Sequence, residues 1–68
     1  MDAMDERYEV VRDLGFGNER LVCSEVTYED AVGSLFDAGG RGLRIDEVRP
    51  APIGSIYPWT FVRTVARW

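Results

Sequence analysis

The clearest hydrophobic pattern lies in the middle of the chain. Apolar side chains recur there at positions i, i+3, i+4, i+7 and i+8, which is the spacing of one face of a helix. The positions are Tyr28, Ala31, Val32, Leu35 and Phe36. Thr27 precedes them and is a residue type that caps helix N-termini, while Gly39 and Gly40 follow them and can adopt the left-handed conformation that ends a helix. The pattern predicts a helix between Thr27 and Gly39.

Two segments before this helix mix strand-forming residues with charged ones. Residues 8–14 and residues 19–26 are rich in Tyr, Val and Leu, with acids and arginines between them, which is typical of half-buried strands. The sequence Gly-Phe-Gly-Asn at residues 15–18 separates the two segments. Glycine and asparagine tolerate the positive φ angles of tight turns. The pattern therefore predicts a β-hairpin over residues 8–26.

Two further strands are predicted after the helix. Residues 43–49 read as the third strand, because Leu43 and Ile45 alternate with Arg44 and Asp46, which is the period of a strand. Residues 50–54, Pro-Ala-Pro-Ile-Gly, cannot continue this strand, because proline has no N–H to donate to a sheet. A last strand is expected over about residues 55–67, and Pro58 restricts its start to a sheet edge or a bulge.

The order of these elements, ββαββ, predicts the fold class. It is an α+β domain in which one helix packs on one face of a mainly antiparallel, four-stranded sheet. We expect residues 1–6 to be a flexible lead-in and residues 7–68 to form a single domain. A chain of 68 residues has a small core, because it buries only about 60% of the surface that its unfolded form exposes. One cysteine, Cys23, permits no intrachain disulfide, so we expect tight packing or a homodimer to supply the stability.

The charges are unevenly distributed along the chain. All eight cations are arginine, and there is no lysine or histidine. Residues 1–38 contain ten acids and three arginines, a net charge of −7, whereas residues 39–68 contain two acids and five arginines, a net charge of +3. The two halves sum to the net charge of −4. The sequence thus predicts a surface polarised between an acidic and a basic part.

The same composition argues against most catalytic mechanisms. The serines and the cysteine have no histidine or lysine to activate them, and zinc sites of the usual ligand types need histidines or several cysteines. The adjacent acids Glu29–Asp30 and Asp46–Glu47 point in different directions within their elements, so neither pair is a ready acid–base couple or metal clamp. We therefore expect a protein that is not an enzyme and has no cofactor or metal.

Aromatic and arginine residues share one face of the predicted last strand. Alternate residues of a strand point the same way, and here they are Tyr57, Trp59, Phe61, Arg63 and Arg67. An exposed face of this kind would anchor a protein partner or stack on nucleic-acid bases. The alternative is that Trp59 and Phe61, with Val65, face the helix and form the core. The sequence leaves both orientations of the strand open.

Acidic residues form a second candidate surface, on the side of the helix opposite its apolar stripe. They are Glu29, Asp30 and Asp37. Such a surface would attract a basic partner, for example a nucleic-acid-binding protein. An ordinary solvated helix face has the same composition.

These observations predict a small protein-binding module in the cytoplasm, without a membrane association. Its expected contact residues are Glu29, Asp30, Asp37, Tyr57, Trp59, Arg63 and Arg67. Anti-restriction and anti-CRISPR inhibitors from phages and mobile elements share its size and charge, and on that analogy alone we expect it to occlude a partner's surface. One alternative is a nucleic-acid-binding domain that uses Arg41, Arg44, Arg49, Tyr57, Trp59, Phe61 and Arg63, although the net negative charge opposes phosphate binding. Another is a structural subunit of a homo-oligomer.

Overall fold

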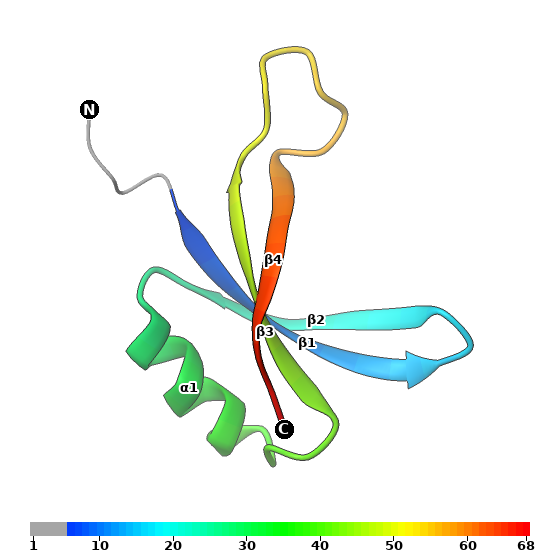
Figure 1. Ribbon diagram of the computed structural model, residues 1–68, viewed down its shortest axis with the longest axis vertical. Coiled ribbons are helices and arrows are strands. Elements are labelled where there is room, and N and C mark those ends of the chain that lie inside the picture. The colour runs from blue at the N-terminus through cyan, green and yellow to red at the C-terminus, as the bar shows by residue number, and fades with distance from the viewer. Residues whose placement is uncertain (1–5) are drawn as a thin grey trace.

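A computed structural model of the chain describes residues 6–68 and contains four strands and one helix. These elements are β1 (Arg7–Gly15), β2 (Asn18–Glu25), α1 (Tyr28–Asp37), β3 (Leu43–Pro50) and β4 (Trp59–Arg67). The strands form one antiparallel sheet in the order β2-β1-β3-β4. Figure 1 shows that the β1–β2 and β3–β4 hairpins diverge from a common crossing region, so the sheet is strongly twisted. The predicted α+β fold with the order ββαββ is confirmed.

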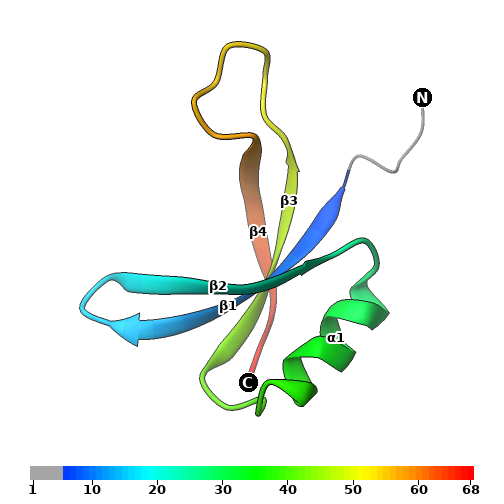
Figure 2. The same ribbon diagram turned by 180° about the vertical axis from the view of Figure 1, so that it is seen from behind.

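Helix α1 covers one face of the sheet, which Figure 2 shows from the opposite side to Figure 1. The core lies between them and consists of Val10, Ala31, Leu35, Leu43 and Ile45. The helical stripe predicted from the sequence supplies two of these residues, and its outer members Tyr28 and Phe36 remain partly exposed. The ring of Tyr28 packs edge-on against Tyr8 at 5.9 Å, and that of Phe36 packs against Trp68 at 5.4 Å. These two pairs close the sides of the small core.

Both termini of the helix lie where the sequence predicts. At its start, the hydroxyl of Thr27 accepts a hydrogen bond from the backbone N–H of Asp30 at 3.1 Å, which satisfies one of the free donors of the first turn. At its end, Gly39 and Gly40 have φ angles of 107° and 76°. The N–H of Gly40 donates to the carbonyl of Leu35 at 2.9 Å, as in the Schellman motif that reverses the chain after a helix.

The predicted turn between the first two strands is a two-residue hairpin loop. Gly15 pairs with Asn18, and the loop residues Phe16 and Gly17 have φ angles of 57° and 81°. Two consecutive positive φ angles match the type I′ turn, whose twist suits a hairpin. Phe16 is thus a non-glycine residue in the left-handed region, where the side chain is disfavoured.

The last strand differs from the prediction in two ways. It begins at Trp59, directly after Pro58, because residues 51–58 form a loop. Two register shifts also interrupt its pairing with β3, and each inserts an extra residue that changes the face of the side chains beyond it. Trp59 and Phe61 therefore lie on one face of the sheet, and Arg63 lies on the other.

Both predicted orientations of the last strand are consequently wrong as stated. The strip with Arg63 beside the aromatic residues is broken, because Arg63 pairs with Glu47 on the face that carries the helix. The alternative, with Trp59 and Phe61 in the core, also fails, because these two residues line the opposite face. Only Val65 packs against the core as that alternative expected.

Of the predicted lead-in, residues 1–6, all but Glu6 lies outside the described residues. Within residues 6–68, no helix has the length and apolar character needed to cross a membrane.

Candidate functional site

The face of the sheet opposite α1 has no element packed on it among residues 6–68 (Figures 1 and 2). We call it the open face. Directly paired residues of antiparallel strands project from the same side, so the register defines its members. They include Glu19, Leu21, Arg7, Glu9, Val11, Arg44, Asp46, Val48, Trp59, Phe61, Thr64 and Arg67.

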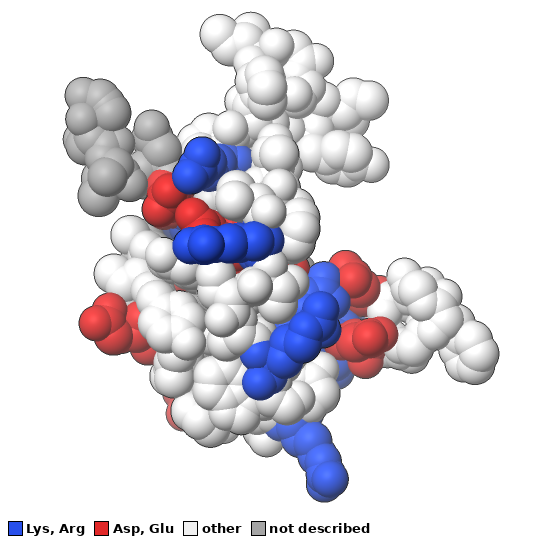
Figure 3. All heavy atoms as spheres, in the orientation of Figure 1, with Lys and Arg blue, Asp and Glu red and all other residues white. Residues whose placement is uncertain are grey.

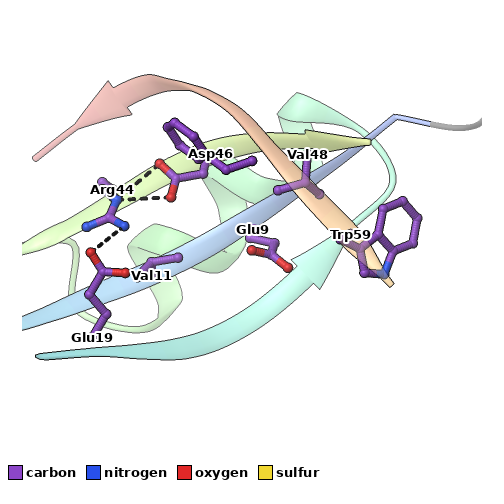
Figure 4. A pocket seen from close by; sticks show the side chains of 8 residues that line it. Glu9, Val11, Glu19, Arg44, Asp46, Val48 and Trp59 are labelled. Carbon is purple, nitrogen blue, oxygen red and sulfur yellow. Dashed lines mark hydrogen bonds and ion pairs between the residues drawn. The ribbon is translucent and has the colours of Figure 1, made fainter. Parts of the chain in front are cut away.

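The centre of the open face is a shallow hollow of about 470 Å³ (Figure 4). Its lining residues are Glu9, Val11, Glu19, Arg44, Asp46, Val48, Trp59 and Phe61. Val11 and Val48 are buried although they lie on the side away from the helix. The twisted sheet thus protects a second, smaller apolar area, which charged and aromatic side chains surround.

Asp46 is the best-satisfied charged group in this hollow. It is 3% exposed, and the single N–H of Arg44 Nε is shared between its two carboxylate oxygens, at 3.1 and 3.0 Å. The hydroxyl of Thr64 donates a second hydrogen bond at 2.7 Å. Arg44 also pairs with Glu19 at 2.8 Å. A buried carboxylate is stable only with such partners, so this network is a fixed part of the fold.

The pKa of Arg44 reflects the same network. Burial would lower the pKa of the guanidinium, because it disfavours the charged form. The hydrogen bonds and the charges of Glu19 and Asp46 outweigh burial, and the pKa is raised above its ordinary value. Arg44 is therefore a permanent cation whose charge is already compensated by two carboxylates.

Glu9 differs from Asp46, its direct neighbour across the β1–β3 pair. Within residues 6–68, its carboxylate makes no side-chain hydrogen bond or ion pair. Burial raises the pKa of Glu9, and the negative charge of Asp46 raises it further. Figure 4 shows its carboxylate in the hollow, on the side toward Trp59 and away from Arg44. Glu9 is thus an acid that is held in a partly apolar place without a cation of its own.

Trp59 forms the boundary between this hollow and the loop of residues 51–58. The guanidinium carbon of Arg7 lies 5.5 Å from the centre of its ring, within the range of a cation–π interaction. Trp59 also lines a second hollow of about 390 Å³ together with loop residues such as Ile56 and Tyr57. In the loop, Ile53, Ile56 and Tyr57 are largely exposed, and Figure 3 shows no charged atoms over its projecting end. The aromatic part of the open face therefore continues into an uncharged, apolar loop.

The structure separates the residues that the sequence predicts as one partner-binding set. Trp59 and Arg67 lie on the open face, and Tyr57 lies in the adjoining loop. Arg63 lies on the helix-bearing face, paired with Glu47 at 2.8 Å. The acids Glu29, Asp30 and Asp37 are exposed on α1, in the layer on the other side of the sheet. The aromatic residues and the helical acids therefore form two distant surfaces.

The arginines proposed for nucleic-acid binding are largely paired with acids. Arg44 binds Glu19 and Asp46, as described above, and Arg63 binds Glu47. The exposed Arg49 lies 3.3 Å from Glu6. Figure 3 accordingly shows acidic atoms next to most of the arginines on the visible face. Three of the five arginines in the basic half of the sequence are thus paired with acids, while the exposed Arg41 and Arg67 have no ion pair within residues 6–68.

Sequence reasoning missed the residues at the centre of the site. Glu9 and Val11 belong to the strand predicted over residues 8–14. Which strand lies beside them, however, depends on the topology of the sheet. The alternation of apolar and charged residues along β1 could have placed Glu9 and Val11 on one face. No local signal indicated that Asp46 and Val48 would complete that face.

The site holds no recognisable metal-binding arrangement among residues 6–68, since no three Cys, Asp or Glu side chains are grouped to hold an ion. Comparison with known proteins gives no further guide, because no protein-family model, curated protein or solved structure matches the chain. The function therefore has to be argued from the open face itself.

Proposed function

We propose that the protein is a non-enzymatic protein-binding module whose binding surface is the open face with the adjoining loop. One observation carries this proposal: Trp59 and Phe61 lie on a sheet face on which no helix or further strand of residues 6–68 packs. The uncovered face of an antiparallel sheet is usually polar. A continuous exposed apolar area instead marks an interaction site.

The residue types of this surface suit binding to another protein. Phe61 is 58% exposed and lies beside Trp59, and aromatic residues supply much of the binding energy of protein interfaces. Paired strands hold both residues, so little conformational entropy is lost on binding. The loop adds Ile53, Ile56 and Tyr57, which extend the apolar area beyond the sheet.

A nucleic acid is a less suitable ligand for the same surface. Non-specific affinity for nucleic acids comes from uncompensated cations, and the arginines at the centre of the face are paired with acids. The net charge of −4 adds a general repulsion. Surface occlusion of a protein partner, as by small acidic inhibitors, is the form of the function that this size and charge favour.

The test compares three forms of the protein as bait in a lysate of its source organism. The open-face variant carries Trp59→Ser and Phe61→Ser, and the control variant carries Glu29→Arg and Asp37→Arg on the helix. We expect wild type and the helix variant to retain the same specific protein and the open-face variant to lose it. Loss in the helix variant alone would reject the open face as the binding surface, and retention of no specific protein by any form would reject the function.

Sedimentation velocity of the wild type over a wide range of concentrations measures its oligomeric state and so tests the homo-oligomer alternative before the lysate experiment. A monomer at all concentrations is expected. A stable dimer that dissociates in the Trp59→Ser, Phe61→Ser variant would assign the open face to self-association and overturn the proposal.

A further inference from the structure

We infer that the hollow of the open face receives a basic side chain of the partner protein, and an arginine in particular. This inference rests on the proposed protein-binding function and specifies the chemistry of its partner. Three features of the hollow support it: its charge, its aromatic wall and the absence of an ion pair on Glu9 within residues 6–68.

The lining of the hollow has an excess of negative charge. Three carboxylates, those of Glu9, Glu19 and Asp46, face one guanidinium, that of Arg44. Arg44 is paired with two of them, Glu19 and Asp46, through contacts of 2.8 to 3.1 Å. Within residues 6–68, the carboxylate of Glu9 is the one without an ion pair, and a cation brought to it would offset both its burial and its repulsion by Asp46.

The surroundings of Glu9 favour a cation with an apolar stem over a hydrated ion. Val11 and Val48 form a buried apolar base, and Trp59 stands at the side of the hollow (Figure 4). Phe61 also lines the hollow. The methylene groups of a long basic side chain can pack on such surfaces while its charged end reaches a carboxylate. An arginine suits this place best, because its flat guanidinium stacks on aromatic rings and binds carboxylates with two parallel hydrogen bonds.

Arg7, the arginine that precedes Glu9 on the same face of β1, does not occupy this position. Arg7 lies two residues before Glu9 on the same face of β1, but its guanidinium lies over the ring of Trp59 at 5.5 Å. It forms no ion pair with Glu9 within the described residues. The contact between Arg7 and Trp59 shows that the ring of Trp59 accepts a guanidinium, while Glu9 has no ion pair within residues 6–68.

The experiment is a titration of the ¹⁵N-labelled protein with N-acetyl-arginine amide, followed by NMR. N-acetyl-citrulline amide, which has the same shape without the charge, is the matched control ligand. We expect a saturable shift of the Trp59 indole N–H signal and of the amides around Glu9 with the arginine probe. The indole signal of Trp68, which packs against Phe36 on the helix side, should stay in place.

Two variants test the role of Glu9. Binding of the arginine probe should weaken about tenfold in Glu9→Gln, because a charge-assisted hydrogen bond is lost, and should be unchanged in Glu29→Gln, which removes an exposed helical carboxylate. A thermal melt of each variant verifies that it is folded. Equal binding of the citrulline probe, an unchanged affinity in Glu9→Gln, or the absence of a saturable shift with the arginine probe would each overturn the inference.

Failure of this inference and failure of the proposed function remain distinguishable. If the lysate partner depends on Trp59 and Phe61 but the arginine probe does not bind, the module is retained and its preference for a basic residue is rejected. If the probe binds at Glu9 but no protein partner depends on the open face, the protein-binding function is rejected.

Discussion

Glu9 and Asp46 lie directly opposite one another on strands β1 and β3, and they are satisfied very differently. Asp46 accepts a bifurcated hydrogen bond from the Nε–H of Arg44 and a second hydrogen bond from the hydroxyl of Thr64. Glu9 has none from a side chain within residues 6–68. Like charges in directly opposed positions destabilise a sheet, so the fold maintains a local repulsion at the centre of its open face.

Replacing Glu9 by Gln should therefore stabilise the protein at neutral pH. The side chain keeps its shape, and the repulsion by Asp46 is removed. We expect the free energy of unfolding to rise by about 0.5 kcal/mol, the scale of a cross-strand pair that solvent partly screens. Urea denaturation at neutral pH measures the change, with Glu29→Gln as a control that should not raise the stability, because Glu29 lies in the first turn of α1, where a negative charge is favourable.

The gain from Glu9→Gln should also depend on pH in a defined direction. Because the pKa of Glu9 is raised from 4.5 in the folded protein, the folded form binds this proton more tightly than the unfolded form. The cost of the ionised carboxylate is thus present above the folded pKa and disappears as the pH falls below 4.5. The difference between variant and wild type should vanish at about pH 4. A gain that grew toward acidic pH would contradict this assignment.

Arg44 should matter far more to stability than an arginine at the surface. Replacing Arg44 by Met leaves Asp46, which is 3% exposed, as a buried charge without its cation, and we expect a loss of about 3 kcal/mol. The matched control is Arg49→Met, because Arg49 and Glu6 are 58% and 39% exposed and 3.3 Å apart. That pair should contribute less than about 1 kcal/mol. Equal losses by urea denaturation would mean that Asp46 does not depend on Arg44.

The double variant Arg44→Met, Asp46→Asn refines this prediction. Removing both charges removes the unpaired buried carboxylate, and the amide can still accept the hydrogen bond that Thr64 donates. We expect it to recover part of the stability that Arg44→Met alone loses. A double variant as unstable as the sum of the single ones would show that the two residues act independently.

The helix and the order of elements could be predicted because their signals are local. Thr27, the apolar stripe and Gly39 all lie within one short segment, and each acts on its own turn of the chain. The hairpin at residues 15–18 is equally local. These local signals determine the helix and the hairpin independently of the neighbouring elements, so both can be predicted from the sequence.

The faces of the last strand could not be predicted, because they depend on its partner. The register shifts at Ile45/Asp46 and Glu47/Val48 arise from pairing between β3 and β4, and no glycine or proline within β4 marks them. Simple alternation therefore placed Arg63 with Trp59 and Phe61. The contact between Glu9 and Asp46 is likewise invisible in the sequence, since it joins strands that are separated by β2 and α1.

Phe16 provides a test of strain at the tip of the first hairpin. It has a φ of 57°, which costs a side-chain-bearing residue about 1 kcal/mol, and it is fully exposed, so no packing offsets the cost. Asparagine tolerates this conformation, and Asn-Gly is the preferred pair for a type I′ turn. Phe16→Asn should therefore raise the free energy of unfolding by about 1 kcal/mol.

The control for this prediction is Ile53→Asn in the loop between β3 and β4. Ile53 is also fully exposed, but its φ angle is not positive. The substitution removes a similar apolar surface without relieving any backbone strain, so its stability should stay within about 0.5 kcal/mol of wild type. Equal gains in both variants, measured by urea denaturation, would attribute the effect to the removal of exposed apolar groups. The two positions share full exposure but differ in φ. A gain in stability in Phe16→Asn alone would therefore assign the effect to relief of backbone strain.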